Sequence, residues 1–219
     1  ASMDSNVLHP SPELPPLPRA GHVDDVDAMA ELQPEWALQY DQLSSGSFFG
    51  SVRQAALPQL HLVAETMSKA ARQRGRTQPG AIGFAFGLSA AGPSFFHGQR
   101  LPSGFLMIGR GDELDLTTPD GFELAGMLAD EALVADAWSR LYRDAEPAWM
   151  RQRVVLQVPR QALLQLRSRH LGVLDGLAAG GVPAGDARAV ACLRDAILLE
   201  WLAIVPARAD VPDGEAIDA

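Results

Sequence analysis

The chain has 219 residues, with 18 Lys or Arg against 27 Asp or Glu and a formal charge of −9. This acidic balance argues against a large nucleic-acid-binding surface, because such surfaces carry a surplus of Lys and Arg. No apolar run is long enough to span a bilayer and no secretory signal opens the chain, so we expect a cytoplasmic protein without a membrane partner. The single cysteine, Cys192, excludes an intrachain disulfide, and its helical setting predicts a small buried side chain.

Residues 1–30 predict an extended, proline-rich N-terminal arm. Five prolines fall between Pro10 and Pro18, and each lacks the N–H that a strand ladder requires. The same spacing matches a proline-rich ligand motif, which is the alternative to a surface arm. Asp24, Asp25 and Asp27 then form an acidic patch suited to the start of a helical turn.

The clearest strand of the chain lies between Ile82 and Leu88, where bulky and small residues alternate. One face carries Ile82, Phe84, Phe86 and Leu88, and the other carries Gly83, Ala85 and Gly87. Glycine weakens a strand and marks either close approach of another backbone or room for something else. The small face therefore predicts either the wall of a ligand cavity or a tight contact between two sheets.

Residues 31–130 as a whole predict a β-barrel domain. Further strands are expected at residues 36–41, 48–57, 59–67, 94–99, 104–109, 113–117 and 121–129, separated by Gly and Pro turns. Within the third of these, His61, Val63 and Glu65 share one face. Residues 68–80 carry Lys69 and three arginines and predict a solvated basic loop. Short strands at this spacing are typical of a sandwich or barrel.

Residues 131–205 predict a helical region. After Asp130, a candidate N-cap, apolar residues recur at helical spacing to Tyr142, and residues 160–177 form a second helix. A third helix follows Gly180-Gly181, so the last two predict an antiparallel hairpin. This third helix is apolar on two sides, which predicts a homodimer interface made of Val190, Leu193, Ile197, Leu198 and Trp201. Residues 206–219 predict an acidic linker.

No catalytic constellation is evident. The five histidines contain no His-x-His pair, and the chain has no Gly-x-Ser-x-Gly motif. His61 and Glu65 share a strand face and His97 lies on another strand, so a three-ligand metal site is geometrically conceivable. We therefore expect no catalytic residue, no metal and no cofactor, with a stand-alone cupin-type metalloenzyme as the alternative.

Several segments resemble the N-terminal sensory domain of the AraC/XylS family of bacterial transcription regulators, in particular the branch of the ethanolamine-operon regulator. They are Gln39 to Gly50, Phe84-Ala85-Phe86, Phe96-His97-Gly98, Gly109-Arg110-Gly111-Asp112-Glu113, Trp138 and the leucine-rich helices near the end. This resemblance covers residues 35–205. It implies an α+β fold in which a cupin-like antiparallel β-barrel or jelly roll binds a small effector and is followed by an α-helical hairpin that dimerises.

The family plan also includes a C-terminal DNA-binding unit of two helix-turn-helix motifs. The chain ends at Ala219, where that unit would begin, so we expect DNA contact only through a unit missing from this sequence.

The leading hypothesis is therefore an effector-sensing and dimerisation domain of an AraC-type regulator. The facing of the strands suggests Trp36, Tyr40, Phe86 and His97 for apolar and stacking contacts with a small-molecule effector, and His61 and Glu65 for polar contacts. The competing hypotheses are the metalloenzyme and a scaffold protein that only dimerises through its final hairpin.

Overall fold

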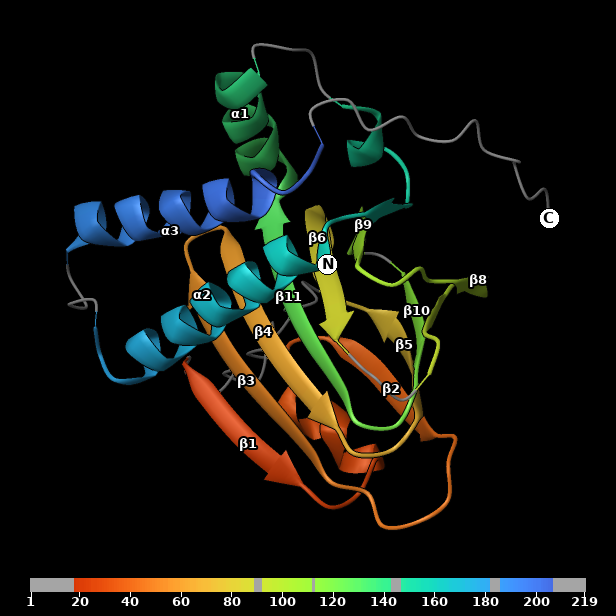
Figure 1. Ribbon diagram of the computed structural model, residues 1–219. Coiled ribbons are helices and arrows are strands. Elements are labelled where there is room, and N and C mark those ends of the chain that lie inside the picture. Colours follow the sequence, from red (N-terminus) through yellow and green to blue (C-terminus); the bar gives the residue numbers. More distant parts are fainter. Residues whose placement is uncertain (1–17, 89–91, 112, 143–146, 182–185, 207–219) are drawn as a thin grey trace, which may run out of the picture.

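Two antiparallel β-sheets and a layer of helices make up the fold (Figure 1). The computed structural model describes residues 18–88, 92–111, 113–142, 147–181 and 186–206. The α+β class predicted from the sequence is confirmed for these ranges. Most of the predicted arm and acidic linker, residues 1–17 and 207–219, lie outside the described residues.

The strands are β1 (Arg19–Val23), β2 (Ala37–Gln42), β3 (Gly50–Leu57), β4 (Leu60–Met67), β5 (Ala71–Arg76), β6 (Ala81–Leu88), β7 (Phe95–Phe96), β8 (Gln99–Arg100), β9 (Phe105–Arg110), β10 (Leu114–Thr118), β11 (Phe122–Asp130) and β12 (Val154–Gln157). The helices are α1 (Glu131–Tyr142), α2 (Arg160–Ala178) and α3 (Ala187–Leu202), with short 3₁₀ helices η1 (Asp27–Leu32) and η2 (Ala148–Met150).

The two sheets face each other and divide the core into two parts. The larger sheet has the strand order β1-β3-β4-β11-β6-β9-β12 and the smaller has the order β2-β5-β10-β7-β8. The alternation of β4 decides which side chains enter each part: Leu60, Leu62 and Ala64 pack toward the helices, whereas Val63 and Met67 pack between the sheets. The facing predicted for this strand is thus confirmed.

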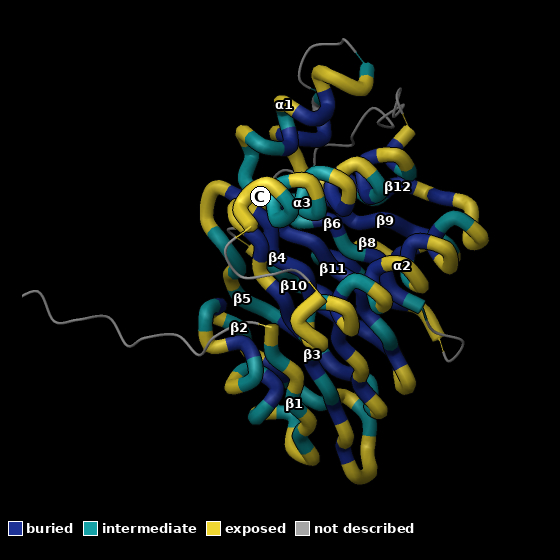
Figure 2. Tube along the Cα trace, turned by 90° about the vertical axis from the view of Figure 1, so that its left-hand side faces the viewer, coloured by how far each residue is buried: buried dark blue, intermediate teal, exposed yellow. Residues whose placement is uncertain are grey.

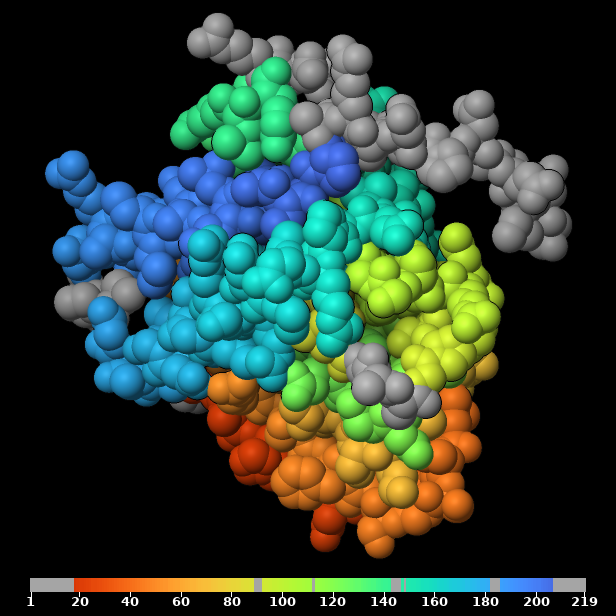
Figure 3. All heavy atoms as spheres, in the orientation of Figure 1, coloured from red at the N-terminus to blue at the C-terminus, as the bar shows by residue number. Residues whose placement is uncertain are grey.

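Helices α2 and α3 run in opposite directions across the outer face of the larger sheet, as Figure 1 shows. In the space-filling view their cyan and blue atoms form a continuous layer over the strands (Figure 3). The burial colouring shows exposed outer surfaces on both helices and mostly buried strands beneath them (Figure 2). None of the described helices is long and apolar enough to cross a membrane.

Helix α3 uses much of its apolar surface within its own chain. Ile197, Leu198 and Trp201 are buried in the core beneath the helices, and Val190 and Leu193 pack against it. The Trp201 ring lies 5.5 Å from the ring of Phe86, between ring centroids. The residues predicted to form a dimer interface therefore pack in the chain's own core, because sequence periodicity does not reveal which apolar side of a helix the subunit itself covers.

The basic segment predicted to be a loop contains strand β5, and this expectation was wrong. Ala71 and Gln73 are buried, whereas Arg72 and Arg74 point outward and pair with carboxylates of the neighbouring strands. Arg72 binds Asp115 of β10 at 2.7 Å and Arg74 binds Asp41 of β2 at 2.6 Å. The period of two was present in the sequence, but arginines occupied its outer positions.

Three smaller expectations also differ from the structure. Part of the predicted arm, β1, pairs with β3, and β12 adds a strand inside the predicted helical region. Cys192 is exposed rather than buried, because it lies on the side of α3 that faces away from the sheet.

The small face of β6 serves two purposes. A Cβ on Gly87 would lie 1.9 Å from Cζ of Phe122, so this glycine is required for close packing of that ring. A Cβ on Gly83 would meet only the carbonyl oxygen of Gly109 at 3.5 Å, which is an ordinary contact. Close packing of the small face is therefore confirmed at Gly87, whereas Gly83 borders open space.

We expect alanine substitutions at the two glycines to change the free energy of unfolding in opposite directions. Gly83→Ala should raise the free energy of unfolding by about 0.5–1 kcal/mol, because alanine loses less conformational entropy in a strand. Gly87→Ala should lower it by about 1–3 kcal/mol, because the buried Phe122 ring must move. Urea denaturation of both variants measures the difference, and equal effects would contradict this account of β6.

A candidate binding cavity between the two sheets

A cavity of about 90 Å³ lies between the two sheets. Its floor is a patch of four small residues on three neighbouring strands of the larger sheet: Gly83 and Ala85 of β6, Gly109 of β9 and Gly126 of β11. Strand register places Gly83 opposite Gly109 and Ala85 opposite Gly126. The space exists because two cross-strand pairs lack bulky side chains at the same place.

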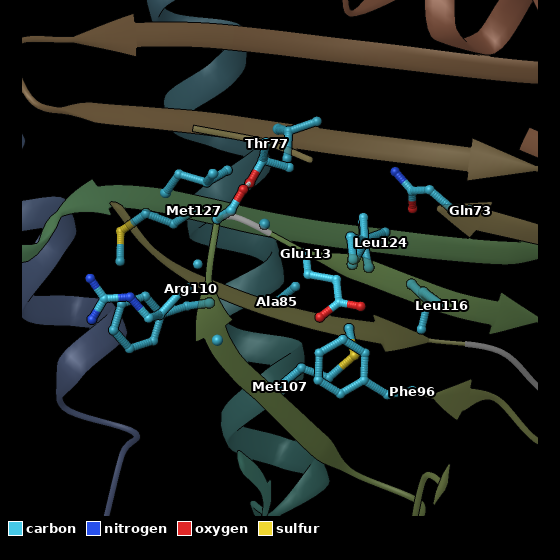
Figure 4. Close-up of a pocket in the computed structure, with 18 residues that line it drawn as sticks. Gln73, Thr77, Ala85, Phe96, Met107, Arg110, Glu113, Leu116, Leu124 and Met127 are labelled. Carbon is cyan, nitrogen blue, oxygen red and sulfur yellow. Dashed lines mark hydrogen bonds between the residues drawn. The ribbon is translucent and has the colours of Figure 1, made fainter. Parts of the chain in front are cut away.

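The walls of the cavity are apolar and come from both sheets. These side chains all belong to the core between the sheets: Val63, Phe96, Met107, Leu116, Leu124 and Leu128. Figure 4 shows Gln73 on one side of the cavity and Arg110 on the opposite side. A molecule in this space would meet mainly hydrocarbon, with polar groups at its ends.

The charged residues beside the cavity are already paired. Arg110 binds Glu131 of α1 at 2.7 Å, and Glu113 accepts a hydrogen bond from Arg153 at 2.9 Å. These four side chains are partly exposed, so the pairs are screened by solvent. Each charge nevertheless has an opposite charge as its neighbour, and the cavity gains no strong net field from this end.

The other end carries a buried polar network centred on Glu65. The Glu65 carboxylate accepts hydrogen bonds from Nε2 of Gln33 at 3.1 Å, from the Tyr40 hydroxyl at 3.2 Å and from Nε2 of Gln73 at 3.4 Å. Nε2 of Gln33 and Nε2 of Gln73 also donate to the Tyr40 oxygen, at 2.6 and 2.7 Å. The network therefore joins β4 of the larger sheet to β2 and β5 of the smaller sheet and to Gln33, which directly follows η1.

A second group of polar residues continues from this network. Nε2 of Gln54 donates to Oε1 of Gln33 at 3.4 Å, and Arg19 contacts both Gln54 and Glu35. His61 lies 3.6 Å from Glu35, measured from Nε2 to Oε1, and packs on Trp36. Burial lowers the pKa of His61 to about 4, so the imidazole is neutral at neutral pH.

Burial also changes the pKa values of Glu65 and Tyr40, the two residues at the centre of the network. Removal from water raises the pKa of Glu65 to about 7, although the hydrogen bonds from Gln33, Tyr40 and Gln73 oppose this rise. Burial, reinforced by the negative charge of Glu65, likewise raises the pKa of Tyr40 well above its usual value. At neutral pH the Tyr40 hydroxyl is thus a donor, and Glu65 exchanges between its charged and neutral forms.

Residues predicted from the sequence to bind an effector fall in three places. Tyr40 and Glu65 are hydrogen-bonded to each other, and Trp36 packs on His61 nearby. Phe86 lies on the helix side of the larger sheet against Trp201, and His97 lies in the turn between β7 and β8. None of the six lines the cavity itself, because strand facing shows which side of a sheet a residue occupies but not its height along the strand.

The hypothetical metal site is not assembled. His97 lies apart from His61 and Glu65, and the described part of the chain contains no group of three or more His, Cys, Asp or Glu side chains that could hold a metal ion.

Gln73 and Gln33 are the polar residues that sequence reasoning missed. Gln73 lines the cavity and Gln33 reaches Glu65 from η1. Gln73 could have been found from its position between Arg72 and Arg74, because alternation places it on the inner face once β5 is accepted as a strand. Gln33 carried no comparable signal.

The raised pKa of Glu65 predicts a specific pH dependence of stability. Between pH 4.5 and 7 the folded chain binds a proton that the unfolded chain releases, so this group stabilises the fold at low pH and its contribution is lost as pH rises. Relative to Glu65→Gln, the wild-type free energy of unfolding should fall by about 3 kcal/mol across this window. Urea denaturation at a series of pH values measures it.

Comparison with Glu65→Gln is needed because histidines with lowered pKa values, among them His61 and His170, act in the opposite direction. Burial lowers the pKa values of His61 and His170 to about 4, so both destabilise the fold as pH falls below 6.5. These contributions are present in both proteins and cancel in the difference. A difference that stays constant with pH would contradict the account of Glu65.

Comparison with known proteins adds a likeness of fold. No family model matches the chain. Among solved structures, the crystal structure of the AraC-like transcriptional activator CuxR is similar, with a TM-score of 0.53 at 14% sequence identity. The likeness covers 91% of this chain and 73% of CuxR. At this identity it shows a shared fold, and nothing in it favours the ethanolamine-operon branch.

Proposed function

We propose that this chain is the effector-sensing and dimerisation part of an AraC-type transcription regulator. The observation that carries the proposal is the fold likeness to an AraC-like activator over 91% of the chain. In this proposal the two facing sheets are a cupin-like barrel, and a cytoplasmic regulator contacts DNA through a helix-turn-helix unit outside this sequence. The acidic charge of −9 agrees with a part that does not itself bind DNA.

The cavity supports the sensing role. It combines an apolar lining with a polar network at one end, which is the usual composition of a small-molecule site. The network reaches three elements outside the larger sheet, namely η1, β2 and β5. We propose binding without catalysis, in which an occupant of the cavity shifts the balance between two arrangements of these elements.

The dimerisation role is assigned to a different face of α3 from the one expected from the sequence. Cys192, Ala196 and Leu199 are exposed on this helix, and Ala203 follows at its end. Their spacing of four, three and four residues is that of a two-helix seam. Leu199 also lines a groove between α1 and α3 together with Leu141.

A second copy of the chain is the proposed occupant of this face. Leu141 and Leu199 are two of the large apolar side chains that the structure leaves exposed, and they line one groove. The heptad-like spacing suits a matching helix, because the same residues can pair across a two-fold axis. This proposal replaces the interface of buried residues and keeps the homodimer.

Light scattering tests the dimer. Wild type at micromolar concentration should have twice the 23.4 kDa mass of one chain, and Leu199→Glu should be monomeric because it places a charge in an apolar seam. Leu164→Glu on α2 is a matched control, since Leu164 and Leu199 are both 39% exposed. A dimer that survives Leu199→Glu would place the interface elsewhere.

A fusion assay tests the regulatory role without a ligand. The chain is joined to a DNA-binding unit that occupies its operator only as a dimer, and operator occupancy is read from a reporter gene. Wild type and Leu164→Glu should repress, whereas Leu199→Glu should not. Absence of repression by the wild-type fusion would overturn the proposal that this chain brings DNA-binding units together.

A further inference from the structure

We propose that the cavity between the sheets takes an uncharged single-ring molecule that donates one hydrogen bond to Oε1 of Gln73. This inference rests on the proposed sensing function and names the chemical class of the effector. Four features of the cavity carry it: its size, its shape, the buried Oε1 of Gln73 that has no partner among the described residues, and the charges around it.

The space between the sheets is about the size of one ring. An engineered apolar cavity of about 150 Å³ holds benzene, and the space here is smaller, at about 90 Å³, and opens to solvent beside the partly exposed side chains of Arg110 and Glu113. Met107 lines the space, and its unbranched side chain can shift to enlarge it. A nucleotide or a fused-ring ligand would extend beyond this space into solvent.

Shape favours a flat molecule. At Gly83 and Ala85 the floor presents backbone and one methyl group, whereas Val63 packs over Gly126 and Arg153 packs over Gly109. Cζ of Phe96 lies 4.0 Å from the position that a Cβ on Gly109 would take, so this ring stands close to the floor. A planar ring can contact both the floor and the Phe96 ring, with aromatic contact as an additional stabilising interaction.

Gln73 supplies the polar contact and sets its direction. Its side chain is 2% exposed and lines the cavity, and among the described residues its Oε1 has no hydrogen-bond partner. The amide cannot be reversed without loss, because Nε2 donates to Tyr40 and Glu65 and a carbonyl oxygen there would face a carboxylate. The free atom is therefore an acceptor, and a buried acceptor favours a ligand that donates.

The charges around the cavity favour a neutral molecule. Glu65 lies directly behind Gln73, at 3.4 Å from its Nε2, so an anion at the same end would meet a like charge in a buried setting. A cation would lose its hydration against the apolar walls, because Glu65 is 2% exposed and does not line the cavity and the lining carboxylate of Glu113 is already paired with Arg153. The arginines and glutamates at the opposite end are paired with each other.

Phenol and toluene form a matched pair of probes, because they differ by the hydroxyl donor. Dissociation constants are measured by ligand-observed NMR for wild type and Gln73→Met. Loss of the acceptor should lower the ratio of phenol affinity to toluene affinity about fivefold to tenfold. Toluene should bind Gln73→Met at least as well as wild type, and Gln165→Met, at an exposed glutamine on α2, should leave both constants unchanged.

Ala85→Leu provides a second variant that does not disturb the polar network. Its longer side chain fills the cavity, so both probes should lose binding while circular dichroism stays that of the wild type. Benzoate, the anionic counterpart, should bind wild type at least tenfold more weakly than phenol. Together these results would support the cavity as the site and a neutral donor as its ligand.

Each part of the proposal would be overturned by a different result. An unchanged affinity ratio in Gln73→Met overturns the role of Gln73, and benzoate binding equal to phenol overturns the neutral class. Failure of wild type to bind either probe, or binding that persists in Ala85→Leu, overturns the assignment of the cavity. The fusion assay uses no ligand, so its failure alone would overturn the proposed regulatory function.

Discussion

The buried carboxylate of Glu65 is the constraint on which much of the packing between the two sheets depends. It lies between two sheets, where an unpaired charge would be costly, and donors from η1, β2 and β5 satisfy it. Those donors belong to segments that are otherwise separate in the sequence, so satisfying one carboxylate fixes their relative positions. The smaller sheet is thus held to the larger one by directed contacts as well as by apolar packing.

The core between the two sheets contains both tightly packed side chains and a cavity, and the register of the strands explains why. Gly87 lets Phe122 approach β6, whereas Gly83, only four residues earlier, has no ring above it. Pairing of Gly83 with Gly109 and of Ala85 with Gly126 enlarges the gap that one glycine would leave. A cavity next to a buried polar network in which Oε1 of Gln73 has no partner among the described residues resembles a binding site more than a packing fault, since packing faults are small and apolar.

The local structure could be predicted from the sequence more accurately than the candidate site. Alternation in β4 and β6 placed Glu65 and Gly83 on their observed faces, and helical spacing located α1, α2 and α3. It could not supply cross-strand register, which determines that Gly83 meets Gly109, nor show that Trp201 serves its own subunit. β5 was missed because charged residues obscured its alternation, and Gln73 was missed with it.

The contact between Gln73 and Glu65 has a consequence for energetics. With a pKa of about 7, Glu65 is partly protonated at neutral pH, and its hydrogen bond from Gln73 favours the charged form. A molecule that alters this hydrogen bond would therefore take up or release protons as it binds, and its affinity would vary with pH by thermodynamic linkage. The enthalpy of binding would then depend on the ionisation heat of the buffer. Through one shared side chain, the chain would respond jointly to an organic molecule and to acidity.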